Sequence, residues 1–300
     1  MRVCVVGAAN IDLISYVPRL PHVGETLHGT QFRMGYGGKG ANQAAMAAKL
    51  RAEVSMVCKV GRDVFGEGTL ENFRSLGVDT THVTFTDEAF SGVAPIAVDP
   101  EGRNAIIIVT GANDLLSLDD LERARPTIAA SDVLVCQLEL PAETSLAALR
   151  IAREENVRTI FNPAPAREDL AEEFYRLSDV FCPNEPETEL LTGMPAGEGA
   201  ARELLARGAG SVVLTLGERG TLVVERDAPA VEVPVDPVRA VDTTGAGDAF
   251  VGALATFLAA GRPLVEAAER ANAVAALSVQ GRGTQTSFPS AADLPAGLLP

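Results

Sequence analysis

The sequence predicts an α/β fold, with a mostly parallel central sheet, helices on both faces and a small β-sheet that forms a lid. Short apolar runs without alternation recur along the chain, and helical patterns separate them. This combination is typical of parallel strands that are buried on both sides. Two segments with a different rhythm, at about 11–36 and 90–110, are the expected lid within a single domain that spans residues 1–300.

Six apolar runs are the predicted strands of the central sheet. They are Val3–Val6, Val54–Val60, Val133–Leu138, Thr159–Phe161, Val180–Cys182 and Val212–Leu216. The helical patterns that alternate with them are Ala41–Leu50, Gly66–Leu76, Leu118–Ala129, Thr144–Glu154 and Ala200–Arg207. A further helix, rich in small residues, extends from Gly245 to about Gly261.

The two lid segments carry strand patterns of their own. Over residues 31–36 apolar and polar or small residues alternate, which predicts a half-exposed strand. Val93–Val98 and Ala105–Val109 flank Asp99–Gly102, a sequence that suits a tight turn between two strands. A small sheet of this kind either covers a site or pairs its edge with a second copy of the chain.

Composition excludes several classes of partner. The formal net charge of −15 argues against nucleic acid and against an anionic membrane surface, both of which call for a basic face. The chain has no tryptophan, and aromatic residues make up only 5% of it, so platforms for stacking bases are few. ATP stays compatible with this charge, because Mg²⁺ and backbone amides neutralise phosphate without a field of lysines.

Cysteine and histidine usage narrows the chemistry. The four cysteines lie far apart without a CxxC pair, and no secretory or membrane-spanning segment is apparent, so we expect reduced thiols and a cytoplasmic protein. The three histidines lie in the first third of the chain, outside recognisable metal spacings. A mechanism based on a Ser-His or Cys-His pair, or on a histidine-rich zinc site, is therefore not expected.

The most informative motif is Asp242-Thr-Thr-Gly-Ala-Gly-Asp-Ala-Phe250, which opens into the long small-residue helix. Unpaired amides at a helix N-terminus attract an anion, and Gly245 and Gly247 let it approach the backbone closely. Asp248 places a possible proton acceptor beside that anion. Transfer of a phosphoryl group to a hydroxyl requires both features. The alternative is structural, since aspartate also caps helices and Gly-Ala-Gly also makes tight turns.

A second glycine motif, Gly37-Gly-Lys-Gly40, joins the alternating strand to a helix and places Asn42 in its first turn. Together with Gly35 it also satisfies the loose G-x-G-x-x-G pattern of dinucleotide sites, and Asp63 follows at about the expected distance. The preceding strand is amphipathic rather than buried, and this is not the first strand–helix unit. The dinucleotide pattern is therefore weak evidence.

Polar residues follow several of the predicted strands, where α/β proteins bind their ligands. Asn10 and Asp12 suit a polyhydroxylated ligand or a local turn, and alternation places Gln137 and Glu139 on one side. Glu187 either faces a hydrated Mg²⁺ or complements a helix N-terminus. The loop Thr215–Gly220 suits either the flat face of a nucleotide or a plain hairpin.

Gly37–Leu50 and Asp242–Phe250 together resemble the two signatures of the PfkB family of carbohydrate kinases. Further matching stretches are Pro21–Gly40, Gln137–Pro141, Asn162–Ala166 and Gly281–Pro289, so the resemblance covers nearly the whole chain in order. It implies ATP-dependent phosphorylation of D-ribose at its 5-hydroxyl, with Mg²⁺ or another divalent cation and K⁺ as an activator. It also implies a homodimer formed through the lid.

The resemblance assigns a role to each matching residue. Asp248 is the implied general base, with the amides of Gly245, Ala246 and Gly247 as the anion hole. The implied sugar-binding residues are Asn10, Asp12, Gly38, Lys39, Asn42, Glu139 and Asp248. The implied nucleotide-binding residues are Asn184, Thr215, Gly217, Gly220, Gly247 and Asn272. Glu187 would hold Mg²⁺ through water. K⁺ would lie among Asp242, Thr244, Ser278, Gly281, Gly283 and Ser287.

Three alternatives stay open at this point. A related kinase of the same family would act on deoxyribose, fructose or a nucleoside, because pocket size is not readable from sequence. A sugar sensor without catalysis would use the same scaffold, although an intact Asp248 speaks against it. A nicotinamide dehydrogenase would use the G-x-G-x-x-G pattern but leaves Asp242–Phe250 unexplained.

Overall fold

The centre of the protein is a nine-stranded sheet, in a computed structural model that describes residues 1–299. Its strands lie in the order β13-β12-β11-β10-β9-β8-β1-β4-β5. They are β1 (Arg2–Val6), β4 (Glu53–Gly61), β5 (Asp79–Thr86), β8 (Val133–Cys136), β9 (Arg158–Phe161), β10 (Val180–Phe181), β11 (Ser211–Thr215), β12 (Thr221–Glu225) and β13 (Val231–Val233). Neighbours from β5 to β11 are parallel, whereas β12 and β13 are antiparallel to their neighbours. The predicted mostly parallel sheet is confirmed.

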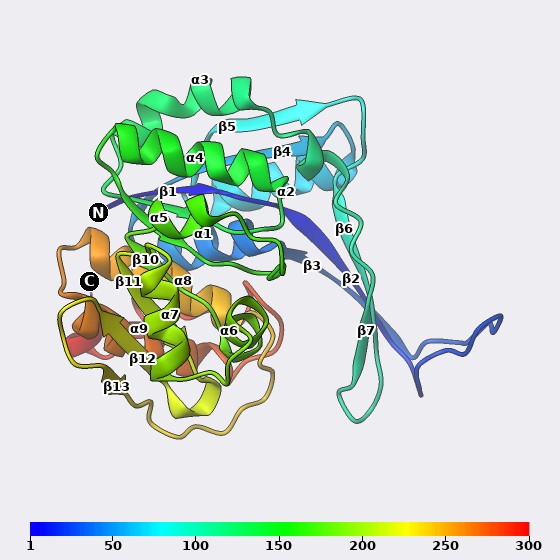
Figure 1. Ribbon diagram of the computed structural model, residues 1–300. Coiled ribbons are helices and arrows are strands. Elements are labelled where there is room, and N and C mark those ends of the chain that lie inside the picture. Colours follow the sequence, from blue (N-terminus) through cyan, green and yellow to red (C-terminus); the bar gives the residue numbers. More distant parts are fainter. Residues whose placement is uncertain (300) are drawn as a thin grey trace.

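Helices cover both faces of this sheet, as Figure 1 shows. One face packs against α1 (Lys39–Lys49), α2 (Val64–Ser75), α8 (Ala246–Ala259) and α9 (Leu264–Ser278). The other packs against α3 (Leu118–Ala129), α4 (Ala142–Glu154), α5 (Glu172–Arg176), α6 (Glu185–Thr192) and α7 (Glu198–Ala206). In strand β1, alternate side chains point into the two cores: Val3 and Val5 belong to one core, and Cys4 and Val6 belong to the other. A strand covered on both faces needs apolar residues at every position.

The structure adds elements that the apolar runs do not indicate. Strand β5 has threonine at four of its eight positions and lies at the edge of the sheet, so it forms no continuous apolar run. Strands β12 and β13 extend the opposite edge through an antiparallel hairpin with a single turn, Gly217–Arg219, between β11 and β12. The predicted strand Val133–Leu138 ends earlier, at Cys136.

The lid is a separate four-stranded sheet with the order β3-β2-β6-β7. Its strands are β2 (Asn10–Tyr16), β3 (Gln31–Gly37), β6 (Gly92–Val98) and β7 (Asn104–Ile106). Strand β2 pairs antiparallel with β3 and parallel with β6, and β7 folds back on β6 through the predicted turn, in which the Gly102 amide donates to the Asp99 carbonyl (3.0 Å). In Figure 1 these strands extend away from the helices and the central sheet. The predicted small sheet beside the central sheet is confirmed.

The lid exposes apolar side chains instead of burying one face. Phe32 is 61% exposed and Met34 is 54% exposed, both on β3. Ile106 on β7 and the following residues Ile107 and Ile108 are exposed as well. The predicted half-exposed strand over residues 31–36 is confirmed as a strand, but its first four residues are exposed on both faces. None of the helices within residues 1–299 combines the length and apolarity that crossing a membrane requires.

Candidate active site

The predicted anion site lies at the start of helix α8. Gly245 adopts a left-handed conformation (φ 79°) immediately before the helix, and Ala246 is its first residue. The Ala246 amide already donates to the Thr243 carbonyl (3.2 Å), whereas the amides of Gly245, Gly247 and Asp248 have no hydrogen-bond partner among the described residues. A Cβ at Gly247 would meet open space. Three unpaired amides and the positive end of the helix dipole therefore gather at the start of α8, where Gly247 leaves the backbone accessible.

Asp248 lies in the first turn of α8, buried between two amide side chains of helix α1. Its Oδ2 accepts a hydrogen bond from Asn42 Nδ2 (2.9 Å), and its Oδ1 accepts one from Gln43 Nε2 (3.1 Å). The two helices can approach this closely because of Gly252, whose Cβ would lie 2.5 Å from the Gln43 carbonyl oxygen. The two glycine motifs of the sequence thus meet at one carboxylate.

Further amide side chains, which we did not predict as site residues, surround this carboxylate. Gln137 Nε2 donates to Gln43 Oε1 (2.6 Å), and Gln43 Nε2 also donates to Asn162 Oδ1 (3.2 Å). On the other side, Gln285 Nε2 donates to Asn42 Oδ1 (3.1 Å). The sequence signal was present, since Gln43 follows Asn42 directly and the other three lie within or beside the matched stretches.

Five of the predicted sugar-binding residues lie around the point where the lid joins the central sheet. Asn10 and Asp12 open strand β2, and Gly38 and Lys39 begin helix α1. The Lys39 amide donates to Oε2 of Glu139, which follows strand β8 (2.7 Å). Gly38 has φ 85°, and a Cβ there would lie 2.8 Å from the Ala8 carbonyl oxygen, so this junction requires glycine.

Asp12 is a carboxylate without a protein partner. It lies over Gly37, where a Cβ would be 2.4 Å from Asp12 Oδ1, and no hydrogen bond reaches it from the described residues. Burial, with smaller contributions from the carboxylates of Glu139 and Asp248, raises the pKa of Asp12 to about 6. A half-buried acceptor that lines a cavity and that no protein group satisfies suits the hydroxyl groups of a ligand.

Opposite charges gather at this pocket. Burial opposes the charge on Lys39, but Asp248, Glu139 and Glu187 outweigh it and raise the pKa of this ammonium group. Burial also raises the pKa of Glu139 and of Glu187, while Lys39 acts in the opposite direction on both. One partly buried cation thus lies in the field of three carboxylates, an arrangement that is common where a protein handles protons or phosphate.

Asn113, which sequence analysis did not single out, fixes Asn10. Its Nδ2 donates to Asn10 Oδ1 (2.8 Å), and its Oδ1 accepts from the Ala9 amide (3.0 Å). Asn113 is fully buried in a short 3₁₀ turn (Gly111–Leu115) that follows the lid. Because Asn10 Oδ1 is occupied, its NH₂ group is the part that is free to donate to a ligand.

Asn184 and Glu187 form the capping box of helix α6. Asn184 Oδ1 accepts from the Glu187 amide (2.8 Å), and Glu187 Oε2 accepts from the Asn184 amide (2.9 Å). The structural interpretation of Glu187 is therefore confirmed. Its Oε1 has no hydrogen bond from residues 1–299, and its charge acts on Lys39. A carboxylate with one free oxygen fits a hydrated Mg²⁺, which needs few protein ligands.

The predicted nucleotide residues lie around the β11–β12 hairpin. Thr215 ends β11 beside Asn184, with which it forms an isolated bridge, and Gly217 and Gly220 form the turn with positive φ. Asn272 projects from α9, but its Nδ2 already donates to Thr221 Oγ1 (3.2 Å) and to the Val233 carbonyl (2.9 Å). In this structure Asn272 therefore holds the hairpin, and a direct contact with nucleotide stays a prediction.

The residues predicted to hold a monovalent cation come together from three segments. Asp242 Oδ2 accepts from the Gly283 amide (2.9 Å), and its Oδ1 accepts from the Thr244 amide (3.0 Å) and hydroxyl (2.6 Å). Gly281 lies against Ser287, because a Cβ there would be 2.9 Å from Ser287 Cβ. Ser278 precedes this loop at the end of α9 and donates its hydroxyl to the Ala275 carbonyl (2.8 Å). Burial opposes the charge on Asp242, but these hydrogen bonds hold its pKa below the ordinary value.

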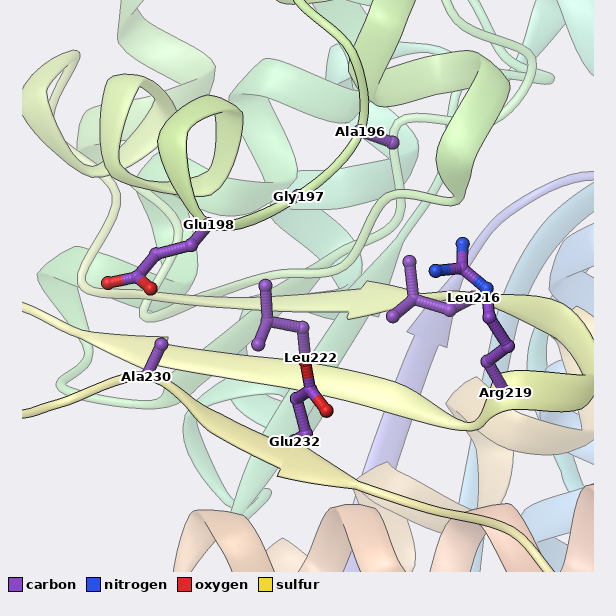
Figure 2. Close-up of a pocket in the computed structure, with 8 residues that line it drawn as sticks. All are labelled: Ala196, Gly197, Glu198, Leu216, Arg219, Leu222, Ala230 and Glu232. Atoms are coloured by element: carbon purple, nitrogen blue, oxygen red, sulfur yellow. The ribbon is translucent and has the colours of Figure 1, made fainter.

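Two cavities differ in their relation to these residues. The larger, of about 1030 Å³, lies between the lid and the loop of residues 282–286, and Asp12, Asp242 and Thr244 line it. The smaller, of about 270 Å³, lies between the start of α7 and strand β12, with Leu216 and Leu222 among its lining residues (Figure 2). No predicted site residue lines the smaller cavity.

Asp63, the acid that a dinucleotide site would need, has another role. It caps helix α2 through hydrogen bonds from the amides of Phe65 (3.0 Å) and Gly66 (2.8 Å). It also accepts from the amide and hydroxyl of Ser91, immediately before strand β6 (both 2.8 Å). Its carboxylate is fully engaged, so the dehydrogenase alternative loses its ribose-binding acid.

The chain matches the family model described as pfkB family carbohydrate kinase over residues 1–291. It is 48% identical to a mouse protein named ribokinase, with 99% of this chain and 94% of that protein covered. It is 42% identical to a deoxyribokinase of Salmonella typhi, with 97% and 96% covered. The fold is similar to that of Arabidopsis thaliana ribokinase complexed with ribose and ATP (TM-score 0.90, 30% identity, 99% and 98% covered).

Proposed function

Because the chain belongs to the pfkB family of carbohydrate kinases, we propose that it is an ATP-dependent ribokinase that converts D-ribose and ATP into D-ribose 5-phosphate and ADP. The observation that carries this proposal is the position of Asp248. Its buried carboxylate adjoins three unpaired helix amides on one side and the pocket of Asp12 and Glu139 on the other. A proton acceptor and an anion site therefore adjoin each other at the first turn of helix α8.

The chemical step follows from this arrangement. Asp248 takes the proton of the sugar 5-hydroxyl as that oxygen forms a bond to the γ-phosphorus. The bond between the γ-phosphorus and the bridging oxygen breaks, and its electron pair leaves with ADP. The amides of Gly245, Gly247 and Asp248 are the donors toward the transferring phosphoryl oxygens, and Lys39 adds positive charge beside them. Ala246 contributes its amide only if its hydrogen bond to Thr243 is released.

The sugar pocket is assigned to Asn10, Asp12, Gly38, Lys39, Asn42 and Glu139. Asp12 supports this assignment best, because its half-buried carboxylate lines the larger cavity without a partner from the described residues. Asn10 offers its NH₂ group, since Asn113 occupies its oxygen. An acceptor and a donor two residues apart on strand β2 suit adjacent hydroxyl groups of the sugar, and these contacts would orient the 5-hydroxyl toward Asp248.

Two cations complete the proposal. Glu187 with its free oxygen, beside Asn184, is where Mg²⁺ would be held through water, and the ion would neutralise phosphate charge. The carbonyls and hydroxyls around Asp242, Thr244, Ser278, Gly281, Gly283 and Ser287 are where K⁺ would be held. Asp242 already ties the loop before α8 to Gly283, so a cation there would stiffen the segment that presents the anion amides.

The adenosine part of ATP is assigned to the side of the β11–β12 hairpin that faces α9, around Thr215, Gly217, Gly220 and Asn272. We treat residues 1–300 as one catalytic domain with a lid. The exposed apolar side chains of Phe32, Met34 and Ile106 support a homodimer formed through the lid. Four buried, unpaired cysteines and the use of ATP support a cytoplasmic location.

Among related substrates, deoxyribose has one specific observation in its favour, the 42% identity to a deoxyribokinase. The test is a coupled assay of ADP release with D-ribose, 2-deoxy-D-ribose, D-fructose and nucleosides at matched concentrations. We expect the highest kcat/KM with D-ribose and a product phosphorylated at position 5. A higher kcat/KM with deoxyribose would transfer the assignment to that sugar. Sugar binding without ADP release from any of them would favour the sensor.

A further inference from the structure

We propose that Gln43 is a positioning residue for Asp248, which it holds in the orientation that proton abstraction requires. The inference rests on the proposed function, because Asp248 is the general base only in a kinase. Gln43 lies on α1 and is fully buried, so it has no surface to offer a sugar or a nucleotide. Gln43 therefore acts on the reaction through the side chains that it contacts, and among these Asp248 is the one that takes part in the chemistry.

The hydrogen bonds of Gln43 allow a single orientation of its amide. Its Nε2 donates to Asp248 Oδ1 (3.1 Å) and to Asn162 Oδ1 (3.2 Å), so both protons are used. Its Oε1 accepts from Gln137 Nε2 (2.6 Å). A flipped amide would place its oxygen against two acceptors and its NH₂ group against a donor. The ionised carboxylate and its neighbours therefore fix the direction of the whole chain of hydrogen bonds.

The residues that support Gln43 lie at the carboxyl ends of strands inside the central sheet. Gln137 follows strand β8 and Asn162 follows β9, the neighbouring strand. Asn162 Nδ2 in turn donates to the carbonyl of Cys182, which follows β10 (2.9 Å). Three adjacent parallel strands thus hold one glutamine through their carboxyl ends. Supporting groups of this kind preserve the geometry of a catalytic group to a fraction of an ångström.

The reaction explains why this support matters. Asp248 must keep one lone pair directed at the 5-hydroxyl while its two oxygens are held by Asn42 and Gln43. Without the Gln43 donor the carboxylate can rotate about its side chain and lose alignment with the hydroxyl proton. Misplacement by about 1 Å is sufficient to lower a rate by about 100-fold. The loss should appear in kcat, because Gln43 does not touch the sugar.

Two substitutions test the proposal in the full-length protein. Gln43→Met keeps the volume and removes every hydrogen bond, whereas Gln43→Glu keeps the shape and replaces the donor with a second carboxyl. We expect kcat with ribose to fall by about 10- to 100-fold in both, with KM for ribose within about threefold of wild type. In Gln43→Glu the acidic limb of the pH–kcat profile should move to higher pH, because a like charge opposes ionisation. Gln31→Glu, exposed on β3, is the matched control.

A structural role would give a different result. Gln43 variants with a lowered Tm but wild-type kcat and pH profile, assayed well below that Tm, would overturn the proposal. If both variants fail to fold, Gln137→Met provides a second test, because Gln137 contacts Gln43 but not Asp248. This variant should lower kcat by about 3- to 10-fold. An unchanged kcat in it would equally overturn the proposal. Wild-type protein in the same assay distinguishes a failure of the Gln43 proposal from a failure of the proposed kinase function. Its inactivity on every sugar would refute the proposed function instead.

Discussion

Replacing Asp12 by asparagine should stabilise the protein while weakening sugar binding. The Asp12 carboxyl has its pKa raised from 3.8 to about 6, chiefly by burial. The stability that its proton provides is complete below pH 3.8 and is lost as the pH rises through about 6. At pH 7.5 the ionised group costs the folded state about 3 kcal/mol, from roughly two pH units at 1.36 kcal/mol each. Asparagine removes that charge.

The assay is urea unfolding of wild type and Asp12→Asn between pH 4 and pH 8, with ribose affinity measured by calorimetry at pH 7.5. The free energy of unfolding of the variant should exceed that of wild type by up to about 3 kcal/mol at pH 7.5 and by about 1.5 kcal/mol at pH 5. Ribose affinity should fall at least tenfold, because a carboxylate acceptor is lost, whereas ATP affinity should not change.

The control Asp227→Asn replaces an exposed aspartate. A stability difference that does not vary with pH would refute the account of the charge. Unchanged ribose affinity would remove Asp12 from the pocket.

Two further outcomes follow from the site. Replacing K⁺ by Li⁺ or Na⁺ in the assay should lower kcat by about tenfold or more through looser presentation of the α8 amides, and equal rates with all three ions would contradict the cation site at Asp242. Glu187→Gln should raise the Mg²⁺ concentration needed for half-maximal activity. Because glutamine also completes a capping box, Tm should stay near that of wild type. A large fall in Tm with an unchanged Mg²⁺ requirement would assign Glu187 to the helix cap alone.

Patterns within the sequence predict the centre of the fold well. Runs such as Val3–Val6 are apolar at every position because helices cover both faces of the sheet, and that requirement is visible in the residues themselves. Strand β5 was not predicted because an edge strand can be half polar. The exposure of Phe32 and Met34 was not predicted because alternation indicates a strand but does not say what covers its apolar face.

The candidate site could be predicted only in part. Glycine motifs indicate where amides are exposed, and Asp248 stands inside one of them. The contacts of Gln43, Gln137 and Gln285 depend on how closely α1 packs against α8, which the small size of Gly252 permits. Nothing near Gln43 in the sequence specifies that residue 248 will lie beside it. The role of Asn113 likewise depends on tertiary structure, because the chain after the lid must return to Asn10 before the two side chains can form a hydrogen bond.

Asp248→Asn tests the central claim most directly, with ribose-dependent ADP release and ribose binding measured on the same preparation. Asparagine keeps the size of the side chain and cannot accept the hydroxyl proton as a carboxylate does. We expect turnover to fall by about 10²- to 10⁴-fold while ribose still binds in calorimetry. Turnover within a few-fold of wild type would show that another group accepts the proton and would contradict the mechanism.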